Sequence, residues 1–266
     1  MYPHAARSRL ITLLNRDARR LETRFRGTIT NEFKQLGAAA VSAWRGVGGS
    51  VVTGMPAPKA LSDRDLHMVQ GMLRELKLAE WHVEHLTAAY KAHYQLVAVR
   101  TIAALGTLGI VIDSPDAIST QILELGGTRA GLVNVEAQTE KAIYRALAEG
   151  RDAGLGPVEL ERHIRALVEG GPNRRVSYRA TRIARTETLH AQRMSALATY
   201  EGSEVFATVI AFDNLTGADD ADCTERDGTE YTYAEADTEA AAEHPNGTLG
   251  FAPGRLAGDR LPPEGF

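Results

Sequence analysis

The chain has 266 residues, of which 44% are hydrophobic and only 6% aromatic, a composition that favours helix packing over a sandwich or barrel core. Its formal net charge of −4 argues against a dedicated basic DNA-binding protein. The single cysteine excludes an internal disulfide framework and a multi-cysteine zinc site. The length suits one large domain or two modest ones.

The sequence predicts neither a signal peptide nor a membrane span. Residues 1–14 contain arginines and no sustained apolar block. The most apolar window, residues 96–112, includes Arg100 and is shorter than the ~20 residues that a transmembrane helix needs. We therefore expect a soluble protein that is made inside a cell and has no membrane partner.

Residues 1–47 are predicted to form a basic amphipathic helix. Its apolar residues recur at helical spacing along one stripe. Four arginines lie off that stripe: Arg9, Arg16, Arg19 and Arg20. This face would contact DNA phosphates or an acidic protein surface, or it is an ordinary solvated helix face. Residues 48–61, rich in glycine and proline, are expected to be a linker.

Residues 62–202 are predicted to form a helical body. A continuous apolar period indicates one long helix over residues 62–105, with a capping-box pattern beginning at Ser62. Four histidines lie on this helix: His67, His82, His85 and His93. We expect them on the solvated surface rather than at a metal site, because no Glu-x-x-His pairing accompanies them. Shorter helices follow, and Gly-Pro and Gly-Gly pairs mark their ends.

The last helix of the body is expected to run from about Asn173 to Tyr200. Its inward stripe includes Glu187, and a carboxylate in a core needs a partner. We expect Glu187 to bond to backbone groups or an arginine of the next element, and so to fasten the C-terminal region to the helices. A role as a general acid or base is the alternative.

Residues 203–266 are predicted to form a small β-containing region with an acidic loop. Residues 205–212 and 229–233 are expected to be strands, residues 223–228 a turn and residues 234–243 a helix, and the tail after Pro253 is expected to be irregular. Arg226 is the only base between Asp213 and Glu243, against eleven acidic residues. The expected fold is therefore mainly α, an elongated helical bundle with a small C-terminal α+β knob.

The C-terminal third contains an ordered set of short motifs. An Arg-Thr-Glu helix, a strand ending in Asp, a Cys-containing turn closing in Asp-Gly, and a His-Pro-Asn follow one another. Their residues are Arg185, Thr186, Glu187, Asp213, Cys223, Asp227, Gly228, His244, Pro245 and Asn246. This arrangement resembles the Mu F-like minor head proteins of tailed bacteriophages, also called phage head morphogenesis proteins.

The resemblance implies a non-enzymatic virion protein that is made in the host cytoplasm and resides in few copies in the capsid interior. It implies association with the portal protein, and it makes the major capsid or scaffold protein and packaged DNA further candidate partners. The family pattern has a second cysteine beside the first and a Cys-Arg-Cys after His-Pro-Asn. This chain has neither, so we expect no metal and no cofactor.

Two alternative functions remain open from the residues alone. One is a small Cys/His-dependent toxin or transferase-like enzyme with Cys223 as nucleophile, His244 as base and an aspartate as orienting group. The acidic loop around the cysteine disfavours its thiolate and argues against this reading. The other is a DNA-binding accessory protein that acts through the basic N-terminal helix.

Overall fold

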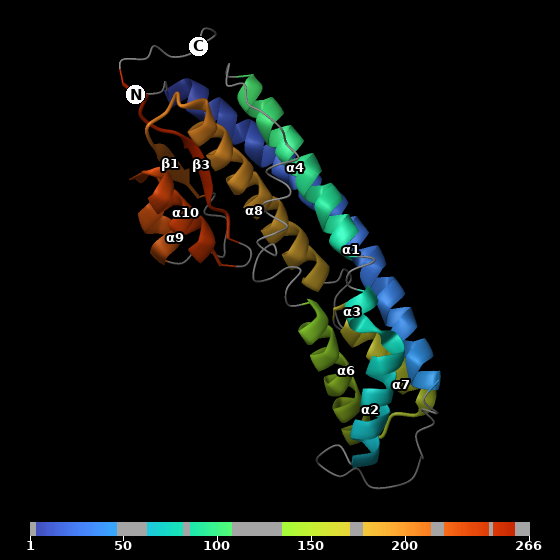
Figure 1. Ribbon diagram of the computed structural model, residues 1–266. Helices are drawn as coiled ribbons and strands as arrows, with labels where there is room; N and C mark the ends of the chain where they lie inside the picture. Colours follow the sequence, from blue (N-terminus) through green and yellow to red (C-terminus); the bar gives the residue numbers. More distant parts are fainter. Residues whose placement is uncertain are drawn as a thin grey trace. The chain divides into compact units, whose positions relative to one another are not determined.

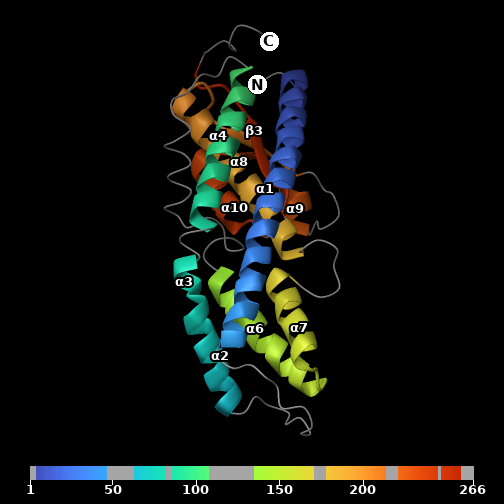
Figure 2. The same cartoon turned by 90° about the vertical axis from the view of Figure 1, so that its right-hand side faces the viewer.

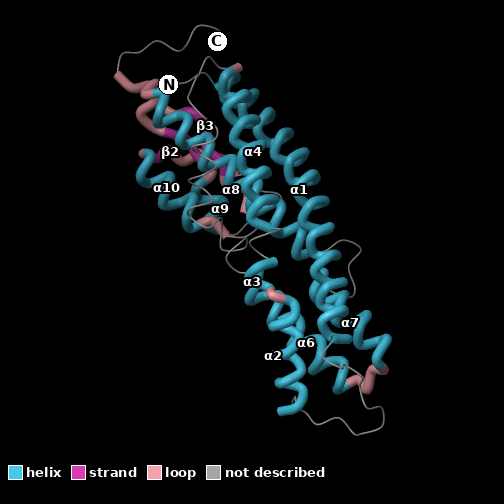
Figure 3. Tube along the Cα trace, turned by 45° about the vertical axis from the view of Figure 1, so that its right-hand side comes forward, coloured by secondary structure: helices cyan, strands magenta, loops and turns pink. Residues whose placement is uncertain are grey.

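The computed structural model describes residues 4–46, 63–81, 86–107, 135–170, 178–213, 221–244 and 247–258. In these ranges the protein is mainly α, with one small antiparallel sheet near the C-terminus (Figure 1). This confirms the predicted fold class, a mainly α chain with a small C-terminal α+β region. Figure 3 shows the strands confined to that region.

The elements follow one another along the chain in a simple order. They are α1 (His4–Gly46), α2 (Asp63–Leu76), α3 (Leu78–Trp81), α4 (Ala88–Gly106), α6 (Val135–Asp152), α7 (Pro157–Glu169), α8 (Tyr178–Ser203), β1 (Val209–Phe212), α9 (Ala221–Arg226), β2 (Glu230–Tyr231), α10 (Tyr233–Ala242) and β3 (Gly250–Pro253).

The chain forms two compact units. Unit 1 comprises Met1–Phe25, Tyr90–Gly131 and Arg182–Phe266, and unit 2 comprises Arg26–Ala89 and Leu132–Thr181. Three helices, α1, α4 and α8, contribute residues to both units.

In unit 1, α8 lies between two layers. The sheet with α9 and α10 is on one side, and α1 with α4 is on the other (Figures 1 and 2). The core joins these layers: Leu10 and Leu14 of α1, Tyr200 of α8 and Phe251 of β3 belong to one buried cluster. Because α8 is covered on both sides, it is buried nearly all round beyond Ile183.

The sheet has the strand order β2-β1-β3, and both pairings are antiparallel. The predicted strand over residues 205–212 is confirmed in its second half as β1, and β2 lies within the second predicted strand. The sequence analysis missed β3, which pairs along all four residues of β1. Gly250 is needed there, because a Cβ at this position would lie 2.3 Å from the Phe212 ring.

Unit 2 contains the second half of α1 with α2, α3, α6 and α7. The predicted ends of α7 are confirmed: Gly156 caps it, Pro157 takes its first position, and Gly170 follows it with a φ of 122°. Arg45 of α1 donates two hydrogen bonds to the Glu161 carboxylate of α7, at 2.7 and 2.5 Å.

The single long helix predicted over residues 62–105 is wrong. α2 ends at Leu76, and Lys77 has a φ of 45°, in the left-handed region. The Lys77 amide donates to the Leu73 carbonyl at 3.2 Å, as in a helix C-cap, and α3 begins immediately afterwards. The apolar period continues through the break, and α2 and α3 both belong to unit 2, whereas nearly all of α4 belongs to unit 1. Ser62, His82, His85 and Asn173 lie outside the described residues.

Candidate functional site

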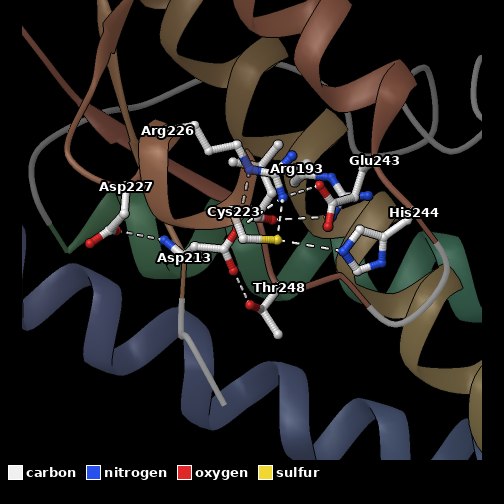
Figure 4. Close-up of polar contacts among 9 residues, drawn as sticks. Arg193, Asp213, Cys223, Arg226, Asp227, Glu243, His244 and Thr248 are labelled. Carbon is white, nitrogen blue, oxygen red and sulfur yellow. Dashed lines mark hydrogen bonds and ion pairs between the residues drawn. The ribbon is translucent and has the colours of Figure 1, made fainter. Parts of the chain in front are cut away.

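Several residues of the predicted motif set meet in one polar cluster of unit 1, drawn in Figure 4. Asp213 directly follows β1, Cys223 and Arg226 lie on α9, and Glu243 and His244 follow α10. We call this group the Arg226 cluster, and its members are Arg193, Asp213, Cys223, Arg226, Glu243, His244 and Thr248. The segment around Cys223 is a short helix rather than the turn that the sequence predicted.

Arg226 is the centre of this cluster. Its Nε and Nη2 donate to Asp213 Oδ2 at 3.2 and 2.9 Å, and Nη2 also forms an ion pair with Glu243. The three side chains are only 8%, 0% and 2% exposed, so the charges pair with each other in place of water. Burial alone would lower the pKa of Arg226, but Asp213 and Glu243 outweigh it and raise the pKa, so the guanidinium stays charged.

Asp213 is bonded through both its carboxylate and its backbone. Its Oδ1 accepts a hydrogen bond from the Thr248 hydroxyl, while Oδ2 takes the bonds from Arg226. Its amide donates to Asp227 Oδ1 at 2.8 Å. Gly228 then takes a φ of 79° and returns the chain to the sheet, where its amide donates to the Ala211 carbonyl at 2.9 Å. Asp213 thus joins β1, α9 and the segment before β3.

Cys223 and His244 are brought together as the enzymatic alternative required. Cys223 Sγ lies 3.5 Å from His244 Nε2 and 3.5 Å from Arg226 Nη2. The cysteine is only 2% exposed. A thiol beside an imidazole can pass its proton to the ring, but here the sulfur is almost completely covered. Pro245 and Asn246 lie outside the described residues.

The sequence analysis missed Arg193 of α8, which is 3% exposed. Its Nη1 donates to the Leu249 carbonyl at 3.1 Å, and this bond ties α8 to the C-terminal region. Burial lowers the pKa of Arg193 to about 10, partly offset by Glu243. No local signal marks such a residue, because its acceptor is a backbone carbonyl far away in sequence.

Glu187 is fully buried, as its stripe predicted, and it bonds to a residue that the sequence did not indicate. The Tyr94 hydroxyl of α4 donates to Glu187 Oε2, so this bond joins two helices and not the C-terminal region. Burial, and then the charge of Glu187, raises the pKa of Tyr94. The neighbouring residues of the motif, Arg185 and Thr186, are half-buried and buried.

His93 lies beside this pair and corrects the expectation of a solvated histidine. It is 5% exposed rather than solvated, its Nε2 lies 2.9 Å from Thr188 Oγ1, and its ring stacks on Phe25 at 3.9 Å. Burial, followed by the charge of Arg24, lowers the pKa of His93 to about 3. His67, in contrast, is exposed as expected.

The predicted basic face of α1 is exposed. Its members Arg9, Arg16, Arg19 and Arg20 all lie on the solvent side of the helix. Arg16 is 3.5 Å from Asp17 and retains 55% side-chain exposure. In the described part of the chain, the other three arginines have no side-chain partner. The basic face is therefore exposed, and Arg16 is the member that a described carboxylate approaches.

Within the described ranges, no group of three or more His, Cys, Asp or Glu residues is placed to hold a metal ion. No helix in the described part is long and apolar enough to cross a membrane. Comparisons of the chain with protein-family models, curated proteins and solved structures found no match.

Proposed function

We propose that this chain is a minor head protein of a tailed bacteriophage. It acts in the capsid interior as a structural component that binds the portal protein during head morphogenesis, and it contributes to DNA packaging or ejection. The proposal rests on the order of the C-terminal motifs, which resembles that of the Mu F-like family.

The observation that carries the proposal is the buried Arg226 cluster. The motif residues Asp213 and Cys223 contact Arg226, and Asp213 is further tied to Thr248. Arg226 forms ion pairs with Asp213 and Glu243, and these three side chains are buried. Such a set is suited to holding several chain segments in one arrangement for a partner to bind, because buried ion pairs and hydrogen bonds fix the relative positions of the segments that carry them.

Head assembly in a reconstituted system tests this proposal. The chain would be co-expressed with the portal, scaffold and capsid proteins of the phage that encodes it, and its copies per purified head would be counted. We expect a few copies in each head and none when the portal gene is omitted. Equal incorporation without the portal, or no incorporation at all, would contradict portal binding.

Matched variants connect this assay to the cluster. Arg226→Met removes the buried guanidinium, whereas Arg255→Met removes an arginine that is 64% exposed and pairs with Glu230 at the surface. We expect the first variant to lower the copies per head and the second to leave them unchanged.

The Cys223–His244 contact of 3.5 Å favours a Cys/His enzyme as the second candidate. In that function the imidazole would take the thiol proton and the sulfur would attack an electrophilic substrate. The rate of Cys223 alkylation at neutral pH separates the two candidates, because this chain has one cysteine. A structural cluster predicts slower reaction than a free thiol such as glutathione, and an enzyme predicts faster reaction that His244→Gln abolishes.

A further inference from the structure

Unit 1 has opposite charge on its two outer layers. On the α1 and α4 side, the exposed cations are the basic face together with Arg24 of α1 and Lys91 and Arg100 of α4. α4 contains no acidic residue at all, and Asp17 and Glu22 of α1 are only half-exposed. This layer therefore carries a positive surface along two neighbouring helices.

The other layer carries the opposite charge. We define its acidic face by the exposed residues of α9, β2, α10 and the turns between them: Glu225, Asp227, Glu230, Glu235 and Asp237. The two arginines nearest the core on this side, Arg193 and Arg226, are buried and face the internal carboxylates Asp213 and Glu243. Arg255 is the exposed base on this side among the described residues, and it pairs with Glu230.

The two charged layers are separated by α8, and they lie on opposite sides of unit 1 (Figures 1 and 2). They are held apart by a packed core that extends from Leu10 to Phe251. Opposite charges that cannot meet within one molecule can still meet between two molecules. Complementary surfaces of this kind steer association and set its orientation.

We propose that the basic face of one copy docks on the acidic face of a second copy of this chain. This contact is heterologous, since it joins two different surfaces, and repeated contacts give a ring if the rotation closes or a filament if it does not. The inference goes beyond the proposed head function and does not rest on it. Nucleic acid is the competing ligand for the basic face, and it appears below as an outcome of the test.

A charge-swap experiment on the full chain tests the proposal. One variant carries Arg16→Glu, Arg19→Glu and Arg20→Glu, and the other carries Glu225→Lys and Asp237→Lys. Wild-type protein, each variant, and a 1:1 mixture of the variants would be followed by sedimentation velocity at low salt, about 0.05 M, and at high salt, about 0.5 M, where charges are screened within a few ångströms.

We expect wild-type protein to form species larger than the 28.8 kDa monomer at low salt and to dissociate at high salt. Each variant alone should associate at least about tenfold more weakly, because like charges then face one another. The mixture should recover association, since the reversed basic face of one variant now matches the reversed acidic face of the other. A variant with Arg16→Lys, Arg19→Lys and Arg20→Lys keeps the charge and should behave as wild type.

Three results would overturn the proposal. The first is a wild-type chain that stays monomeric at low salt. The second is an association that the mixture of variants does not recover, which would place the contact on other surfaces. The third is a monomeric chain that binds a DNA duplex through these arginines, with an affinity that falls steeply with salt, which would assign the basic face to nucleic acid. Recovery in the mixture also shows that both variants are folded.

Discussion

At the scale of single residues, we expect the replacement of Arg226 to cost a large part of the folding free energy. This arginine is 8% exposed and neutralises two carboxylates that are 0% and 2% exposed. Arg226→Met would leave Asp213 and Glu243 buried without their cation, and breaking a buried pair in this way costs about 3–5 kcal/mol. We expect that loss in the free energy of unfolding, measured by urea denaturation with circular dichroism.

Arg255→Met is the matched control, because it removes an arginine from an ion pair in the same region. Arg255 is 64% exposed, so its pair with Glu230 should contribute only about 0–1 kcal/mol. If both variants lost the same free energy of unfolding, the buried ion pairs of Arg226 would contribute no more to stability than an exposed pair.

Some of the residues in the Arg226 cluster could be predicted from the sequence, and others could not. Asp213, Cys223 and His244 could be singled out because each belongs to a short motif, and the structure brings the three close together around Arg226. Arg193 could not be singled out, because its structural role depends on burial and on a hydrogen bond to a carbonyl 56 residues away. The bond between Glu187 and Tyr94 could not be predicted for the same reason, because Tyr94 lies on a helix 93 residues earlier.

At the scale of elements, the break after α2 carries a local cost. Lys77 has a φ of 45°, where a Cβ meets the following carbonyl, and this costs an L-residue about 1–2 kcal/mol. Glycine has no Cβ, although it loses more backbone entropy on folding. We therefore expect Lys77→Gly to raise the free energy of unfolding by about 0.5–1 kcal/mol. Urea denaturation, monitored by the fluorescence of Trp44 and Trp81, measures this change, because both tryptophans lie in unit 2.

Lys77→Ala is the control for this change. It also removes the exposed ion pair between Lys77 and Glu80, but it keeps a Cβ in the left-handed region. Its free energy of unfolding should therefore not exceed that of the wild type. If Lys77→Gly were no more stable than Lys77→Ala, the left-handed conformation would not be a cost to the chain.

Elements with strong local signals were predictable, and those that depend on tertiary contacts were not. Gly156, Pro157 and Gly170 mark the ends of α7 by their own backbone preferences. In α10, the Thr232 hydroxyl accepts from the Glu235 amide. In contrast, β3 is four residues long and lacks a repeating pattern, and it exists because it completes a sheet with β1. The break at Lys77 could likewise not be predicted, because the apolar period of the sequence continues across it.

At the scale of the whole molecule, two buried histidines make stability depend on pH. Burial lowers the pKa of His93 and of His190 to about 3, helped by Arg24 and Arg193 respectively. The unfolded chain binds protons on these rings near pH 6.5, whereas the folded chain does not. Stability is therefore fully present above about pH 6.5 and falls as the pH drops, by up to about 1.4 kcal/mol per unit for each histidine.

Urea denaturation at pH 7.0, 6.0 and 5.0 measures this dependence in a window where most carboxylates remain ionised. The double variant with His93→Gln and His190→Gln cannot take up these protons, so its stability should change less over the same range. An identical pH dependence in wild type and double variant would mean that other groups bind the protons.

The division of the chain between the two units also has a consequence for synthesis on the ribosome. Unit 2 ends at Thr181, so all of its segments have been made well before the chain is finished. The core of unit 1 includes both Leu10 and residues as late as Ala252. The apolar stripe at the start of α1 shares this core with α4 and α8 as well, but the core is complete only when β3 has left the ribosome. A nascent chain with this order of segments exposes part of the unit 1 core until late in synthesis, and exposed apolar surface of this kind is prone to aggregation.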